Sequence, residues 1–334
     1  MRYSIVDQGW DKNWRKLFKD GYHHLTIDGE TWSLSLKDRE LVEWINRIGR
    51  APEYLRRVAV HRWLRAKAQP AARMKNGFAI CTGAGIPGLP EALVAADRQF
   101  AVYEAYRRDP ENAGLAANLE AYRAEQFKTE NEPLKHIPFR YDPEIARTLI
   151  RPFLSPKLYI AAADYLGIMP ILKSVRIVYS ANVDEGKLRS SQLLHLDPEG
   201  ARQAKLFIAV RDVGPENSPL TIVPERQTLD LIATGNPAFT GKRVRDSKIL
   251  KRVPHSEWVS HEGPPGTTMF VDTSRCFHYG SRPSPKPRLL LYAQYLDPFC
   301  SVFPVSRTGL RELSKTYSFY TPQNLAEAYL LGFK

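Results

Sequence analysis

Two histidines and one aspartate have the residue types and the spacing of a metal site. His195 and Asp197 are separated by one residue, and His278 follows 83 residues later. Two imidazoles and one carboxylate can occupy one face of an octahedral Fe(II) ion, which leaves three positions for substrate and oxygen. Taken singly, each residue is as well explained by a surface ion pair or a buried histidine. The set of three therefore carries the prediction of a metal site.

A β-barrel can bring these three side chains together. Alternate residues of one strand point the same way, so His195 and Asp197 can reach a common ion. His278 must then come from a strand that is near in space and distant in sequence. Arg288 follows His278 by ten residues and opens the apolar run 289–293, so its backbone is expected to be buried. A buried guanidinium needs an anionic partner, which makes Arg288 a candidate anion-binding residue.

The chain reads as mostly helical before residue 171 and mostly extended after it. Apolar residues at helical spacing predict helices, and alternation of apolar and polar residues predicts strands. Helices are expected over 35–48, 52–67, 90–127 (a pair broken at 109–110) and 143–167, and strands over 75–81, 175–180, 205–213, 218–224, 267–272 and 289–295.

The length of 334 residues suits one large domain with extensions. Residues 1–74 are predicted to be a helical N-terminal extension. The range 75–300 is predicted to be the catalytic barrel, with an insertion at 225–262, and 301–334 to be a helical C-terminal tail. Ser35 and Asp38 look like the N-terminal cap of the first helix in the extension.

The net charge of +12 is unevenly placed. Residues 1–74 carry 15 Lys or Arg against 9 Asp or Glu, and a second basic cluster lies in the insertion. Long insertions beside a site are often lids, so Lys242, Arg243 and Arg245 are candidates for a lid that faces an anionic substrate. A solvated excursion is the alternative. Nucleic-acid binding is a weaker interpretation, because no recognised motif accompanies the charge.

Arg176 belongs to an alternating segment in which Val175, Ile177 and Tyr179 occupy one face. If its face points into the barrel, the guanidinium is available to a carboxylate. A surface or edge-strand arginine is the alternative.

Several other classes are disfavoured. No run of about 18 apolar residues is present, so no membrane span is expected. The N-terminus lacks the apolar core of a signal peptide, and three cysteines without metal spacing fit a reducing cytoplasm. The segment 83–88 matches G-x-G-x-x-G, but no second strand follows at the distance that a dinucleotide-binding fold requires.

Around these residues the sequence resembles the non-haem Fe(II)/2-oxoglutarate oxygenases, specifically the phytanoyl-CoA dioxygenase-like group. The resemblance extends over about residues 74–298. The segment 205–213 is similar to the strand that follows H-x-D, and 218–224 is similar to the family's G-P-L-x-x-x-P turn and strand. Residues 225–227 read Glu-Arg-Gln where the family often has Gly-Ser-His, which is a departure on the substrate side of the pocket.

The resemblance implies an α+β fold with a mainly β core, namely a double-stranded β-helix (a jelly-roll or cupin-like barrel) buttressed by helices. It implies that His195, Asp197 and His278 bind Fe(II) and are catalytic. Arg288 would pair with the distal carboxylate of 2-oxoglutarate, and Arg176 is a second candidate for cofactor binding. The implied reaction consumes O2, hydroxylates a small-molecule metabolite and releases succinate and CO2. A barrel that binds metal or ligand without turnover is the alternative class.

Overall fold

A computed structural model describes residues 24–27, 30–109, 134–180, 188, 190–240, 243–302 and 308–334. Two of the expectations fall outside these ranges: the second half of the helix pair, at 110–127, and the lid residue Lys242. The described chain contains helices and antiparallel sheets, which agrees with the predicted α+β class.

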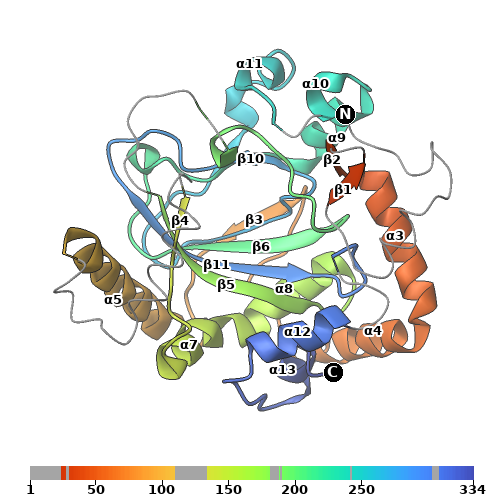
Figure 1. The fold of residues 1–334 in the computed structure, drawn as a ribbon, viewed down its shortest axis with the longest axis vertical. Helices are drawn as coiled ribbons and strands as arrows, with labels where there is room; N and C mark the ends of the chain where they lie inside the picture. The colour runs from red at the N-terminus through yellow and green to blue at the C-terminus, as the bar shows by residue number, and fades with distance from the viewer. Residues whose placement is uncertain are drawn as a thin grey trace.

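The largest element is a sheet of six strands in which every neighbouring pair is antiparallel (Figure 1). The long strand β11 lies between β5 and β6. In spatial order the strands are β3 (Phe78–Cys81), β9 (Thr268–Val271), β6 (Gln203–Ala209), β11 (Arg288–Leu296), β5 (Ile171–Ser180) and β4 (Leu134–Ile137). Because β3 pairs antiparallel with β9, the glycine-rich segment after it is not part of a parallel βαβ unit, as the sequence indicated.

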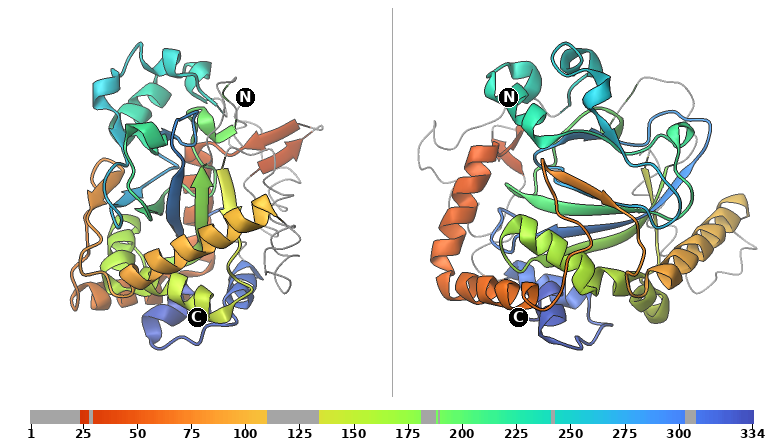
Figure 2. Two further views of the ribbon diagram at one scale, coloured as in Figure 1. Left: turned by 90° about the vertical axis from the view of Figure 1, so that its left-hand side faces the viewer. Right: turned by 180° about the vertical axis from the view of Figure 1, so that it is seen from behind.

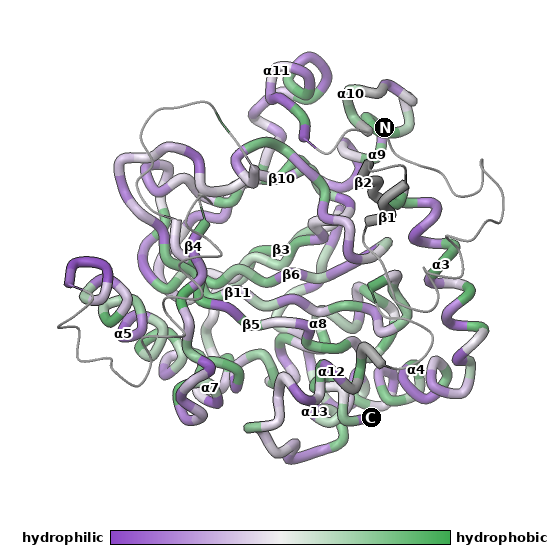
Figure 3. The backbone as a smooth tube through the Cα atoms, viewed as in Figure 1, coloured by the Kyte–Doolittle hydropathy of each residue, from purple (hydrophilic) through white to green (hydrophobic). Residues whose placement is uncertain are grey.

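The two faces of this sheet have different environments. Ile177, Leu291 and Ile208 are neighbours across three strands, are fully buried and belong to the main hydrophobic core. The next register row, Phe207 and its neighbours on β11 and β5, points to the opposite face and lines a cavity. Hydrophobic stretches mark these central strands in Figure 3.

Three helices cover the core face: α5 (Leu89–Arg108), α7 (Pro143–Ile150) and α8 (Pro156–Leu166). The prediction of a single helix over 143–167 was wrong, because a 3-10 turn, Arg151–Leu154, separates α7 from α8. Pro152 lies in the first turn of the 3-10 segment, and Pro156 lies in the first turn of α8. Proline has no backbone N–H and clashes with the preceding turn, so each proline ends one segment and begins another.

A smaller sheet of three strands, β10 (Phe277–Tyr279), β7 (Thr221–Val223) and β8 (Val259–Ser260), lies on the cavity side of the large sheet. The insertion at 225–262 folds onto it as the helices α9 (Glu225–Ala233), α10 (Pro237–Thr240) and α11 (Asp246–Ile249). These helices lie at one end of the molecule, with α7 and α8 at the other (Figure 2). Both sheets contribute to the cavity, and their closure into a jelly-roll barrel stays a prediction.

The N-terminal region contributes a hairpin, β1 (His24–Ile27) and β2 (Glu30–Ser33), and two helices, α3 (Leu36–Gly49) and α4 (Ala51–Arg65). The cap predicted at Ser35 and Asp38 is confirmed, since both hydrogen bonds of a capping box are present. The C-terminal region holds the helices α12 (Thr308–Thr316) and α13 (Leu325–Leu330). Among the described helices, none is long and apolar enough to cross a bilayer.

Helix α3 buries a different face from the one its apolar pattern suggests. Trp44 and Ile48 are 60% and 57% exposed, whereas Arg39 and Glu43 are buried. On α4, Arg57 is fully buried and paired with Glu53. A buried charge is tolerated when ion pairs and backbone carbonyls satisfy it, so tertiary partners override the local apolar pattern here.

Candidate metal centre

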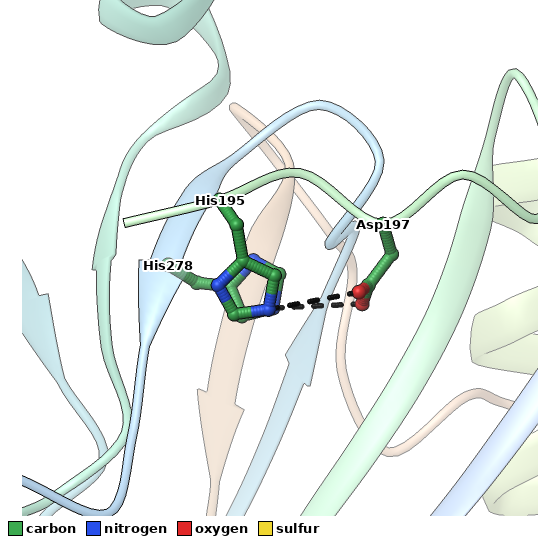
Figure 4. Close-up of side chains that lie close together, drawn as sticks. All are labelled: His195, Asp197 and His278. Atoms are coloured by element: carbon green, nitrogen blue, oxygen red, sulfur yellow. Dashed lines mark ion pairs between the residues drawn. The ribbon is translucent and has the colours of Figure 1, made fainter. Parts of the chain in front are cut away.

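The sequence placed His195, Asp197 and His278 in one site, and the structure brings their side chains together (Figure 4). His278 is the middle residue of β10, and His195 lies beside it in an isolated antiparallel bridge. Each of the two backbone N–H groups donates to the other residue's carbonyl at 3.1 Å. This bridge places two imidazoles side by side although the histidines are far apart in the sequence.

The three side chains leave room for an ion between them. The distance from His195 Nε2 to Asp197 Oδ1 is 3.8 Å, and from His278 Nε2 to Asp197 Oδ2 it is 3.5 Å. One ligand atom from each residue lies within 4.8 Å of the others. Two imidazole nitrogens and one carboxylate oxygen at such separations fit the donor set of a divalent transition metal.

Backbone carbonyls select the imidazole tautomers. His195 Nδ1 lies 2.8 Å from the carbonyl oxygen of Leu193, and His278 Nδ1 lies 3.1 Å from that of Cys276. A carbonyl only accepts, so Nδ1 carries the proton in both rings. The lone pair of each Nε2 is then directed toward Asp197, as metal ligation requires.

Charge at the site suits a cation. Burial lowers the pKa of His195, and burial together with the neighbouring His195 lowers the pKa of His278 to about 3, so both rings are neutral at pH 7. Burial alone would raise the pKa of the Asp197 carboxyl, but Lys205 and the two histidines hold it well below its usual range. The site therefore presents two neutral nitrogens and one ionised carboxylate.

Lys205 is a residue that sequence analysis passed over. It stands on β6, is 7% exposed, and its Nζ lies 2.5 Å from Asp197 Oδ2. Burial would lower the pKa of this ammonium, but Asp197 raises it, so the lysine is charged. A lysine between Ala204 and the apolar residues 206–209 was the available signal, since buried lysines are rare unless paired.

Arg288 lies in the same cavity, which has a volume of about 260 Å³. It is 4% exposed, and its Nη1 donates to the carbonyl oxygen of Ser218 at 2.5 Å. Its Nε has no hydrogen-bond partner among the described residues, and burial lowers the pKa of the guanidinium to about 10. A buried guanidinium with no carboxylate partner among the described residues fits an anionic ligand such as 2-oxoglutarate, whose distal carboxylate can accept two parallel hydrogen bonds.

Two further arginines and a histidine are relevant to the site. Arg176 lines the cavity at its exposed edge, and its Nη1 lies 3.0 Å from His136 Nδ1. Arg282, which follows His278 by four residues, pairs with both oxygens of Asp246 at 2.7 Å and is thereby neutralised. His261, in the insertion 225–262, is fully buried, and its Nε2 lies 2.9 Å from the Thr267 carbonyl oxygen.

Comparison with known proteins gives no family model that matches the chain and no curated protein that matches it. The chain is similar to solved structures at low identity. EctD from S. alaskensis with 2-oxoglutarate and 5-hydroxyectoine is 17% identical, with a TM-score of 0.42 over 66% of this chain and 71% of that chain. AviO1 from Streptomyces viridochromogenes Tue57 is 15% identical, with a TM-score of 0.37 over 67% and 91%.

The epimerase SnoN, in complex with Fe3+, alpha ketoglutarate and nogalamycin RO, is also similar. It is 17% identical, with a TM-score of 0.32 over 63% of this chain and 88% of that chain. At these scores the assignment of a function rests on the side-chain geometry of the present chain.

The candidate lid lies next to the cavity. Arg243 is exposed, and its Nε donates to the carbonyl oxygen of Ser190 at 2.9 Å, one residue before the cavity-lining Ser191. Arg245 is exposed at the N-terminus of α11. Val244 between them bridges to Leu194, one residue before His195. The insertion therefore adjoins the metal-site segment, and its action as a substrate lid stays a prediction.

Proposed function

We propose that this chain is an Fe(II)- and 2-oxoglutarate-dependent oxygenase of the phytanoyl-CoA dioxygenase-like group that hydroxylates a small molecule. One observation carries the proposal. Two neutral imidazole Nε2 atoms and the Asp197 carboxylate converge in a cavity that also contains Arg288, a buried cation whose Nε has no partner among the described residues. A metal site and an anion site in one cavity suit a metal-chelating dicarboxylate.

Each residue has a distinct role in this proposal. His195, Asp197 and His278 hold the metal, and the carboxylate also offsets part of its charge. Fe(II), when bound, supplies the activation of O2 that is coupled to decarboxylation of 2-oxoglutarate to succinate and CO2. Arg288 orients the co-substrate by its distal carboxylate, and the apolar cavity residues Leu220 and Leu290 exclude water from it. Lys205 holds Asp197 in its ionised form.

The substrate is proposed to be a small metabolite with an acidic group. Lys205 is paired with Asp197 and Arg288 is assigned to 2-oxoglutarate, which leaves Arg176 as the remaining Lys or Arg among the described residues that line the cavity. It has no carboxylate partner among the described residues and adjoins His136 at the exposed edge. An anionic group of the substrate or the proximal carboxylate of 2-oxoglutarate would satisfy its guanidinium.

Succinate formation tests the assignment. The protein, reconstituted with Fe(II), should form succinate from 2-oxoglutarate in an O2-dependent manner, and a screen of acidic metabolites should find compounds that accelerate it. The Asp197→Ala variant should lose this activity and bind Fe(II) more weakly. Unchanged activity in the variant contradicts the metal assignment, whereas metal binding without succinate indicates a binding protein.

A further inference from the structure

Helix α3 makes direct contacts with the loop that carries Asp197. Arg39 on this helix is 2% exposed, and its Nη1 donates to the carbonyl oxygens of Asp197 and Gly200, both at 2.8 Å. Glu43, one turn later, accepts a hydrogen bond from the backbone N–H of Ala201 at 2.7 Å. Two buried polar side chains of one helix thus hold the backbone of the loop 197–201.

The other side of Asp197 is held as well. Its backbone N–H donates to the carbonyl oxygen of Thr273 at 2.8 Å, in the turn that leads to His278. The peptide groups before and after Asp197 are therefore each fixed by a hydrogen bond. Fixing both peptides sets the direction of the Cα–Cβ bond, and with it the place of the carboxylate.

Helix α3 is itself firmly placed. Asn46 donates to the carbonyl oxygen of Phe299 at 2.9 Å, and Arg47 Nη2 lies 2.5 Å from Asp297 Oδ2. These partners follow β11, so α3 stands at the end of the large sheet where β6 begins and β11 ends (Figure 1). At Gly200 an added Cβ would lie 2.9 Å from the Arg202 carbonyl oxygen and 3.4 Å from Glu43 Oε1, so helix and loop approach closely.

We propose that Arg39 is a positioning residue for Asp197, so that α3 is part of the metal centre and not an appended extension. This inference rests on the proposed metal-binding role of Asp197. Apolar contacts alone are enough to dock a helix against a domain. A buried guanidinium, in contrast, needs hydrogen-bond acceptors that offset the free-energy cost of its desolvation. Two of the acceptors of Arg39 are the backbone carbonyls of Asp197 and Gly200, in the loop that carries Asp197. Supports of this kind typically change metal affinity by about 10- to 100-fold when removed.

The neighbouring helix α4 offers a matched control. Arg57 is also fully buried, and it donates to the carbonyl oxygens of Met169 at 3.2 Å and Lys334 at 2.8 Å, away from the three metal-site residues. Arg39→Met and Arg57→Met each remove one buried guanidinium and leave backbone carbonyls without a donor. Arg57→Met also removes the buried ion pair with Glu53, so it should lower the melting temperature at least as much as Arg39→Met, whereas only Arg39→Met should affect the metal.

Titration of the full-length metal-free protein with Co²⁺, followed by ligand-field absorption, tests this at a temperature where circular dichroism shows folded protein. We expect Arg39→Met to bind Co²⁺ about tenfold more weakly than wild type or worse, and Arg57→Met to stay within about twofold. The Arg39→Met absorption band should also shift, because Asp197 is displaced. Equal affinities in the two variants overturn the inference, whether both are reduced or both unchanged.

A second pair of variants decides the matter if Arg39→Met does not fold. Glu43→Gln keeps an acceptor for the Ala201 N–H, whereas Glu43→Leu removes it. Co²⁺ affinity should be retained in the first and fall about tenfold in the second; equal affinity in both overturns the inference. Failure of the proposed function has a different signature, namely that wild type binds no Co²⁺ or that Asp197→Ala binds it equally well.

Discussion

Lys205 Nζ lies 2.5 Å from Asp197 Oδ2, so a metal-site carboxylate is also half of a buried ion pair. The lysine side chain is 9% exposed and the aspartate side chain 17%. Asp197 therefore forms an ion pair with Lys205 and is also a ligand of the proposed metal, together with the two imidazoles. This arrangement makes the aspartate structural as well as functional, and the two contributions can be separated.

A double-mutant cycle separates them. In the metal-free protein Asp197→Ala should lower the free energy of unfolding by about 3–5 kcal/mol, because it leaves the Lys205 ammonium buried without a partner. Lys205→Met added to Asp197→Ala should recover a large part of that loss, since the remaining charge is removed. Urea denaturation measures all four free energies. Strict additivity of the two single effects would contradict the buried pair.

Arg288→Lys should weaken the binding of 2-oxoglutarate by about 1–3 kcal/mol, because lysine keeps the charge and loses the two parallel hydrogen bonds. Affinity for the metal should be unchanged, since Arg288 is not a ligand. The measurement is an anaerobic titration of the Fe(II) protein with 2-oxoglutarate, followed by its metal-to-ligand absorption band. Equal affinity in wild type and variant would remove Arg288 from the site.

Two other arginines provide comparisons in the same titration. Arg282→Lys should leave 2-oxoglutarate affinity unchanged, because Arg282 is neutralised by Asp246. Arg176→Gln should weaken it by less than about 1 kcal/mol if Arg176 binds the co-substrate, since solvent screens an exposed pair. No change in 2-oxoglutarate affinity, with a raised KM for the acidic substrate, would assign Arg176 to the substrate instead.

Neutralising Lys242, Arg243 and Arg245 together to glutamine should raise the apparent KM for an anionic substrate and leave that for 2-oxoglutarate nearly unchanged. The reason is that Arg243 contacts the segment beside the cavity, whereas Arg288 binds the co-substrate within it. Steady-state kinetics with a substrate found by the succinate screen measures both constants. Neutralising the three basic residues at 248, 251 and 252, all exposed in the same insertion, serves as the charge-matched control. Equal changes in both constants would rule out a substrate lid.

The buried imidazole of His278 should make the metal-free protein less stable in acid. Burial and the neighbouring His195 lower its pKa to about 3 in the folded state, below the ordinary value near 6.5. As the pH falls below about 6.5, the unfolded chain takes up a proton that the folded chain refuses, so stability is lost progressively toward pH 3. Each pH unit in this window costs about 1.4 kcal/mol per group.

The comparison for this prediction is His278→Gln, which has no titrating ring. Asp272 and Glu43 have pKa values raised to about 7 and about 8 by burial, so they act in the opposite direction over the same range. The difference between wild type and variant cancels their contribution. Urea denaturation at pH 7, 6 and 5 should show a wild-type stability that falls more steeply than that of the variant. Parallel pH dependences would contradict the shifted pKa.

Residue type and local spacing were enough to predict which three residues form the candidate metal site. His195-x-Asp197 with a distant His278 predicts a group that the structure brings together, because alternation along extended chain gives the first two residues a common direction. The same reasoning located β5, β11 and the burial of Arg288. These features depend on residues that are neighbours in sequence, so their pattern is visible without the fold.

Contacts between distant residues were decided by the tertiary structure. Lys205 contacts Asp197 because β6 lies next to the loop 197–201 in the folded chain. Arg39 contacts the same loop although it is 158 positions away from Asp197 in the sequence. The apolar spacing of α3 pointed to a face that is exposed at Trp44, while the face that carries Arg39 and Glu43 is buried against the loop. A charged side chain is stable in the interior only when specific partners surround it, and those partners are supplied by segments that no local pattern relates.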